Sequence, residues 1–191
     1  MKKGLFLLLW FFGCATVAQY VITVDPFPTP REAPSGREVL VTEFVDARRV
    51  DTPQLIGRKG DKGVPLLLSL TPSTLLSREV RDFLLREGFQ VKGEAPSWDL
   101  SPEGLDPSWG DLVVGGRLER LWIEVGGGLA PRCKVQIEVS FAIAREGKVE
   151  RRRVEVEEER RLSGFDEEKL SRLLGTLLAE AIRRGLYDLP Q

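Results

Sequence analysis

Few side chains in this sequence have the chemistry of a catalyst. The 191 residues contain no histidine, which removes the commonest general base and metal ligand, and only two cysteines, Cys14 and Cys133. Cys133 begins an alternating apolar stretch and shares one face with Val135, so we expect a buried, inert thiol. The sequence therefore predicts a protein that is not an enzyme and that holds no metal or cofactor.

Two neighbouring segments form the most suggestive charged cluster. Asp46 and Arg48 are followed by the basic, glycine-containing stretch of Gly57, Arg58 and Lys59. A glycine-rich basic loop can offer backbone N–H groups to a phosphate or a lipid headgroup. The Gly-Lys-Ser/Thr sequence of a phosphate-binding loop is absent, however. Two interpretations stay open, a contact loop for a partner or headgroup and a flexible loop with solvated charges.

Charged and aromatic side chains are also concentrated in the second half of the chain. Residues 151–161 contain five arginines, four glutamates and two valines. This pattern predicts a strand with a solvated, charged face rather than a carboxylate active site. Trp98, Trp109 and Trp122 lie in or near a predicted loop and strand. If exposed they would mark a partner site; otherwise they cover one end of the core.

The amino terminus has the pattern of an export signal. Lys2 and Lys3 precede an unbroken apolar run, LFLLLWFF, which is too short to span a bilayer as a helix. The run ends at Gly13-Cys14, which resembles the lipobox at which bacterial lipoproteins are cleaved and acylated, although Phe11 and Phe12 are bulkier than usual. Cleavage after Ala18 is the alternative, and it would discard Cys14.

These features divide the chain into three parts. We expect a lipoprotein signal peptide at 1–13, cleavage between Gly13 and Cys14, a lipid anchor and proline-rich tether at 14–37, and a single periplasmic domain at 38–191. The first few residues of the stretch 20–37 could pair as an edge strand. Several acyl chains, palmitate among them, would hold Cys14 permanently in the membrane. The absence of aspartate after Cys14 favours the outer membrane.

The pattern of apolar residues predicts the elements that position these side chains. Thr71-Pro72 begins one amphipathic helix that Gly88 ends, and Ser163 begins a second that ends at Gly185. Residues 46–63 and 93–110 predict loops, and Gly115-Gly116 predicts a bulge or a close backbone approach. We therefore expect an α+β fold, a single mixed or antiparallel β-sheet with two amphipathic helices packed on one face. Strands are predicted over 38–45, 64–70, 89–91, 111–125, 133–144 and 149–162.

Composition narrows the possible partners. Lysine and arginine total 28 against 29 acidic residues, a net charge of −1, which does not favour nucleic acid. The chain has no asparagine, one methionine and 30% charged residues, a balance similar to that of thermophile proteins. The expected partners are the membrane, through the lipid anchor, and other envelope proteins.

Roughly residues 38 to 187 resemble the YajG-type family of bacterial lipoproteins. The segments that carry the resemblance are FVDARRVDTPQLIGRKG, LSLTPSTLLSREVRDFLLREGFQVKG, DLVVGGRLERLWIEVGGG and CKVQIEVSFAIAREGKV. The resemblance implies a lipoprotein in a wider set of periplasmic lipoprotein domains, of a family whose biochemical role is poorly defined. The tether, the compact body and the missing catalytic groups predict a non-enzymatic cell-envelope lipoprotein, a binding or scaffolding component of an envelope complex. The alternative is an auxiliary lipoprotein of a lipid or lipopolysaccharide transport system, which would need an apolar groove between helices and sheet.

Overall fold

The long strand β7 (Leu112–Val125) organises the sheet in this computed structural model, which describes residues 18–25, 37–93, 104–187 and 189. One edge of β7 pairs along its whole length, antiparallel, with β8 (Arg132–Arg145). Its other edge pairs in succession with β2 (Glu38–Val41), β3 (Val45–Asp46) and β4 (Leu55–Lys59), each in parallel.

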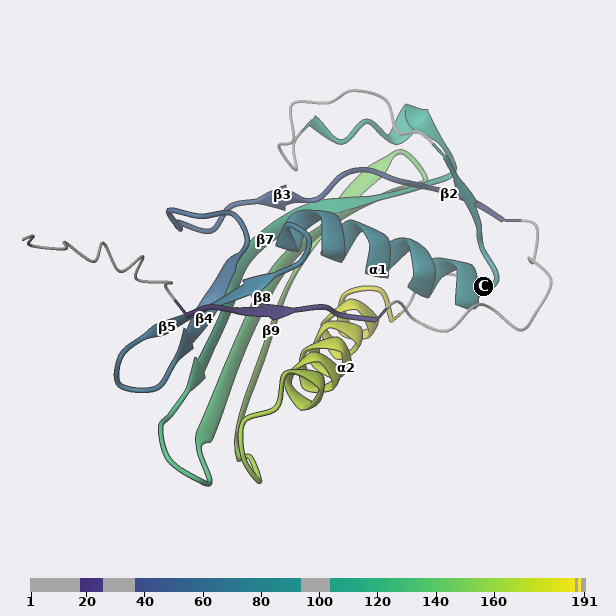
Figure 1. Ribbon diagram of the computed structural model, residues 1–191. Coiled ribbons are helices and arrows are strands. Elements are labelled where there is room, and N and C mark those ends of the chain that lie inside the picture. The colour runs from purple at the N-terminus through teal and green to yellow at the C-terminus, as the bar shows by residue number, and fades with distance from the viewer. Residues whose placement is uncertain (1–17, 26–36, 94–103, 188, 190–191) are drawn as a thin grey trace, which may run out of the picture.

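The remaining strands extend the sheet on both sides. Beyond β8 lies β9 (Lys148–Arg161), antiparallel to it, and β6 (Gln90–Lys92) is parallel to β2. β5 (Val64–Leu68) is antiparallel to β4, and β1 (Tyr20–Ile22) is parallel to β5. The helices α1 (Pro72–Arg86) and α2 (Glu167–Gly185) cover one face of this sheet (Figure 1). The predicted α+β class is confirmed.

Apolar alternation decides which side of each strand the helices cover. On β8 every second side chain is buried in the core, as predicted, while Gln136 and Ser140 lie on the other face. On β9 only Val154 and Val156 point into the core. The helices contribute the opposing stripe, in which these side chains are buried: Leu75, Leu76, Val80, Leu84, Leu170, Leu173, Leu174, Leu177, Leu178, Ala181 and Ile182.

The predicted start of the first helix is confirmed, and that of the second is wrong. Thr71 caps α1 by accepting a hydrogen bond from the Thr74 N–H, and Pro72 is the first helical residue. α2 is capped by Asp166, whose carboxylate accepts from the N–H groups of Glu168 and Lys169. A carboxylate with two donors also complements the positive end of the helix dipole, so Asp166 is a better cap than Ser163.

The loop predicted over 46–63 is a second correction, because residues 55–59 form β4. Gly57 lies so close to β7 that a Cβ atom would be 2.0 Å from the Ile123 carbonyl oxygen. Glycine is a weak strand former, and it is present here because the two backbones approach closely. Gly116 behaves similarly, since its Cβ would be 2.4 Å from the Ser140 oxygen, whereas the bulge in β7 lies between Leu118 and Arg120.

Residues ahead of position 38 also belong to the folded body. Ile22 and Val24 are buried in the core, and the Ser171 hydroxyl of α2 donates to the Thr23 carbonyl. The segment predicted as a tether therefore contributes an edge strand to the sheet. The predicted cleavage and acylation residues, Gly13 and Cys14, lie outside the described residues.

Candidate functional site

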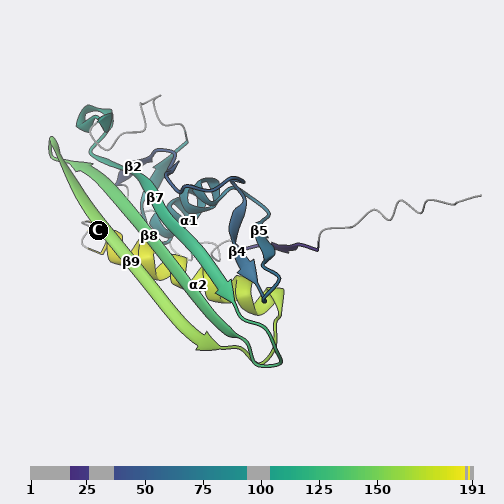
Figure 2. The same cartoon turned by 90° about the vertical axis from the view of Figure 1, so that its left-hand side faces the viewer.

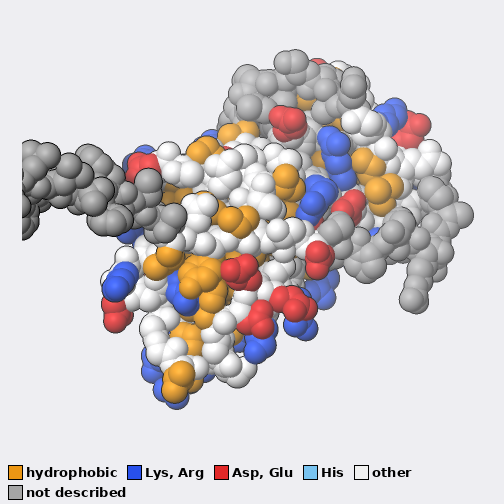
Figure 3. Space-filling model, viewed as in Figure 1, with side chains coloured by type: hydrophobic (Ala, Val, Ile, Leu, Met, Phe, Trp, Pro, Cys, Tyr) orange, Lys and Arg blue, Asp and Glu red, His pale blue; other side chains and the backbone are white. Residues whose placement is uncertain are grey.

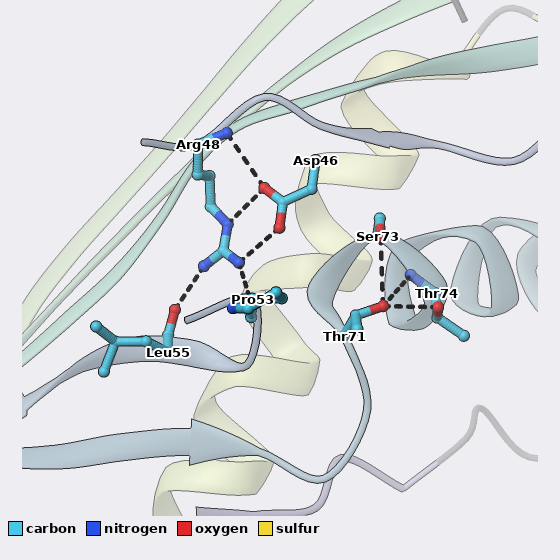
Figure 4. A network of polar contacts seen from close by, with 7 residues as sticks. All are labelled: Asp46, Arg48, Pro53, Leu55, Thr71, Ser73 and Thr74. Carbon is cyan, nitrogen blue, oxygen red and sulfur yellow. Dashed lines mark hydrogen bonds and ion pairs between the residues drawn. The ribbon is translucent and has the colours of Figure 1, made fainter. Parts of the chain in front are cut away.

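The Asp46 and Arg48 side chains bond to each other, and Arg48 also bonds to nearby backbone carbonyls (Figure 4). The Arg48 Nε and Nη2 atoms donate to the two Asp46 carboxylate oxygens at 2.8 and 2.7 Å. Nη1 donates to the Leu55 carbonyl at 2.7 Å, and Nη2 also donates to the Pro53 carbonyl at 2.6 Å. The Arg48 side chain is only 3% exposed. These bonds use four of the five guanidinium N–H groups and tie the segment after β3 to the start of β4, so Arg48 serves the fold before it could serve an external phosphate.

Lys59 has a comparable structural role. Its Nζ donates to the Tyr20 hydroxyl at 3.0 Å and lies 4.6 and 4.3 Å from the ring centres of Tyr20 and Phe165. A cation over two aromatic faces is attracted to both. Lys59 thereby joins β4 to β1 and to the segment before α2. Arg58, by contrast, is exposed, so the five residues of the predicted contact loop do not form one surface.

Two buried ionisable groups lie elsewhere in the core. Cys133 is fully buried, and burial raises the pKa of its thiol, as expected for an inert cysteine. Glu79 on α1 is 2% exposed, and burial raises the pKa of its carboxyl although the Arg78 guanidinium, 2.8 Å away, opposes the shift. Arg78 also donates to the Val24 carbonyl. Both side chains are buried, so neither is presented to solvent as a reactive group.

The charges of β9 and β8 make exposed ion pairs across the sheet. Lys134 is 2.8 Å from Glu157, and the hydrogen bonds from Lys134 and Gln136 hold the pKa of the Glu157 carboxyl below its usual value. Exposed pairs of this kind contribute little to stability. Figure 3 shows positive and negative side chains interspersed on the face it displays. Among the described residues no group of histidine, cysteine or carboxylate side chains could hold a metal ion.

The strongest candidate for a contact site lies on the face of the sheet opposite the helices (Figure 2). Trp122 projects there, because its neighbours Leu121 and Ile123 point into the core. It is half-buried and its indole N–H donates to Glu124 at 3.2 Å. Arg49 and Arg120 are exposed beside it. Together they line an open hollow of about 500 Å³ whose walls are Ala47, Arg48, Arg49, Val50, Glu119, Arg120, Leu121, Trp122 and Gln136.

This hollow was only partly visible in the sequence. Trp122 was a candidate, but Arg49 and Arg120 were not, since they are 71 positions apart and meet only because β7 pairs in parallel with β3. The bulge after Leu118 brings Arg120 to the outer face. Of the other tryptophans, Trp109 covers a small apolar cluster of Leu40, Leu105 and Val113 at one end of the sheet, and Trp98 lies outside the described residues.

Comparisons with known proteins support the fold of this chain and do not identify its function. No protein-family model matches the chain, and no curated protein is similar to it in sequence. The crystal structure of protein XCC0632 from Xanthomonas campestris, of the DUF330 family, is similar with a TM-score of 0.53 at 17% identity over 89% of this chain and 94% of that one.

Two further solved structures are similar more loosely. An uncharacterised protein has a TM-score of 0.50 at 13% identity, covering 86% of this chain and 95% of that one. Lipoprotein GNA1162 from Neisseria meningitidis has a TM-score of 0.42 at 12% identity, covering 75% and 96%. At these identities the likeness to the first two establishes a shared fold, and the third likeness is too loose to support a function. Within the described part of the chain, no helix is long and apolar enough to span a membrane.

Proposed function

We propose that this chain is a non-enzymatic lipoprotein of the bacterial cell envelope that holds another envelope protein against the outer face of its sheet. The observation that carries the proposal is the hollow around Trp122, flanked by Arg49 and Arg120. Tryptophan and arginine are the residues most enriched among those that dominate binding energy at protein interfaces. An open, mixed-charge hollow suits a protein surface better than a buried small molecule.

The anchor rests on the sequence. An apolar run that ends at Gly13-Cys14 supports cleavage there and acylation of the Cys14 sulfur, with the outer membrane favoured because alanine follows the cysteine. The folded body starts close behind, at β1. A chain anchored in this way would present its sheet near the membrane surface.

The lipid-transport alternative has no specific support in the fold. It requires an apolar groove between helices and sheet, and in the described part of the chain the apolar side chains of the two helices pack directly against those of the sheet. We therefore propose the scaffolding function alone.

Cross-linking in living cells tests the contact surface. The tagged full-length chain should cross-link to one defined envelope protein, and Trp122→Ala should reduce the yield by at least tenfold, since loss of an interface hot spot costs about 2 kcal/mol or more. Leu129→Ala is the matched control, because Leu129 is also a large apolar side chain and is 96% exposed, far along the β7–β8 turn. Equal yields from Trp122→Ala and the wild type would refute the contact surface.

Intact-mass analysis tests the anchor separately. Expressed in a bacterium that processes lipoproteins, the chain should begin at Cys14 and carry the additional mass of its acyl chains. Cys14→Ser should leave the chain unprocessed and unacylated. Cleavage after Ala18 in the wild-type chain would overturn the anchor and leave the contact surface untouched.

A further inference from the structure

One edge of the long strand β9 plays no part in the proposed function. Among the described residues β9 pairs with β8 alone, and Figure 2 shows it as the outermost strand of the long three-stranded part of the sheet. A strand of 14 residues with one edge open is a template for pairing with another chain. Natural proteins protect such edges with charges, so the order of the charges along β9 decides what it can accept.

The charges of β9 are self-complementary when the strand is read against itself in reverse. Arg151–Arg153 occupy one half and Glu157–Glu159 the other, with Glu155 at the centre. An antiparallel copy centred on Glu155 would set Arg153 opposite Glu157, Arg151 opposite Glu159 and Glu150 opposite Arg160. Arg152 would lie opposite Glu158, but it does not contribute to this match, because its side chain is only 11% exposed and donates to Glu150 and to the Gly185 carbonyl. Val154 would lie beside Val156. Opposite charges directly across an antiparallel pair are favourable, and twofold symmetry makes each pair occur twice.

Neighbouring registers lack this match. A slip of two residues in one direction opposes Glu150 to Glu158 and Lys148 to Arg160. A slip of two in the other direction opposes Arg152 to Arg160 and Glu155 to Glu157. Like charges directly opposite are unfavourable. A slip of one residue would place side chains of the core face beside side chains of the outer face. The register centred on Glu155 has one like-charge contact, Glu155 against its own copy, whereas its other charged pairs are all of opposite sign. The charge order therefore favours this register over its neighbours.

The backbone is arranged for the same register. The ladder between β8 and β9 continues as a hydrogen bond from the Leu162 N–H to the Pro131 carbonyl, at 2.9 Å. Because residues of an antiparallel strand bond alternately to one side and the other, the even-numbered residues of β9 bond to β8. The odd-numbered residues, Glu155 among them, direct N–H and C=O groups to the open edge. A self-pair at Glu155 would then exchange both hydrogen bonds across the twofold axis.

Members of this match already have ion-pair partners within the chain, but they stay exposed to a second partner. Arg153 pairs with Glu138 and is 74% exposed, and Glu150 pairs with Arg145 and Arg152 and is 42% exposed. Glu157, Glu158 and Glu159 pair with Lys134, Arg160 and Arg132, and all six side chains are well exposed. Exposed ion pairs bind weakly and leave carboxylate oxygens open to a second cation. We propose that two copies of this chain associate through β9, antiparallel and centred on Glu155, to form one continuous sheet. This inference concerns a second copy only, and it depends on neither the anchor nor the Trp122 hollow.

Cysteine cross-linking of the full-length chain in detergent tests the register, in a Cys14→Ser background that leaves the buried Cys133 as the native thiol. The centre of the interface is the one place where a residue meets its own copy, with Cα atoms about 5.5 Å apart, within the range that a disulfide bridges. Under mild oxidation Glu155→Cys should therefore give a covalent dimer. Glu157→Cys is the matched control, since its copy would be four residues away along the strand, about 14 Å.

The expected result is at least tenfold more dimer from Glu155→Cys than from Glu157→Cys or from the Cys14→Ser chain alone, whose Cys133 is buried. The double variant with Arg153→Cys and Glu157→Cys should regain the cross-link, because those positions face each other. Circular dichroism establishes that each variant is folded. Absence of dimer from both Glu155→Cys and the double variant, or equal yields from Glu155→Cys and Glu157→Cys, would overturn the proposal.

Discussion

Replacement of Gly57 by alanine should destabilise this protein severely, because the β4–β7 pairing has no room for a methyl group. The new Cβ would lie 2.0 Å from the Ile123 oxygen, 2.8 Å from its carbonyl carbon and 2.9 Å from its nitrogen. All three are backbone atoms of β7, which is held along its other edge by β8. Neither strand can yield by rotating a side chain, so β4 must move outward by about an ångström or more to restore ordinary contact distances.

The expected loss follows from that displacement. Overpacking costs about 1–3 kcal/mol, and each ladder hydrogen bond that is lost adds about 1 kcal/mol. The bond from the Gly60 N–H to the Val125 carbonyl, 2.7 Å, lies on the same ladder. We therefore expect Gly57→Ala to lower the free energy of unfolding by about 3 kcal/mol or more, and the melting temperature by roughly 6–12 °C for a domain of this size.

Urea unfolding followed by circular dichroism measures the loss. Gly93→Ala is the matched control, because a Cβ atom there would have no neighbour within 4 Å and the backbone is not in the left-handed region. We expect that variant to unfold within about 0.5 kcal/mol of the wild type, as surface substitutions usually do. If Gly57→Ala were as stable as Gly93→Ala, the close approach of β4 and β7 would be wrong.

Three further predictions concern other positions in the fold. Gly175→Ala, in the middle of α2, should stabilise the protein by about 1 kcal/mol in the same assay, since its Cβ would make an ordinary 3.5 Å contact with Val24 and alanine is the better helix former; a loss of stability would contradict it. In a Cys14→Ser background, Cys133 should react with a thiol reagent only at urea concentrations that unfold the chain, because burial protects it and raises the pKa of its thiol; rapid reaction of the native protein would refute this. Burial raises the pKa of Glu79, so its contribution to stability is present below the unfolded pKa and is lost as the pH rises through the folded pKa. Glu79→Gln should therefore be more stable than the wild type at pH 7, with the difference shrinking toward pH 4, and a difference independent of pH would count against the buried carboxyl.

Local patterns in the sequence were sufficient to predict the core faces of most elements. In β8 the alternation from Cys133 to Ile143 predicts the buried face, because successive side chains of a strand point to opposite sides. Thr71-Pro72 predicts the start of α1, because a hydroxyl cap and a proline at the first position satisfy local backbone requirements. The turn at Glu146-Gly147, where both φ angles are positive, sets the β8–β9 hairpin in the same local way.

The candidate site was less predictable, because its residues are brought together by pairing between distant strands. Asp46, Arg48 and Lys59 have the composition of an anion-binding loop, yet the fold directs them to Leu55, Pro53, Tyr20 and Phe165. A charged side chain whose hydrogen-bond donors are occupied by partners within the fold has few donors left for a ligand. Arg49 and Arg120 show the reverse case, since neither belongs to a motif and both become exposed beside Trp122.

By itself, then, the sequence determined the class of fold, the faces of its helices and long strands, and the absence of histidine-based chemistry. These depend on residue types and on periodicities of a few residues. Only the tertiary structure decided that β7 pairs in turn with β2, β3 and β4, and that β4 exists at all. The local sequence around Gly57 predicts a loop. In the structure Gly57 lies in a strand, where the absence of a side chain lets the backbone of β7 approach closely.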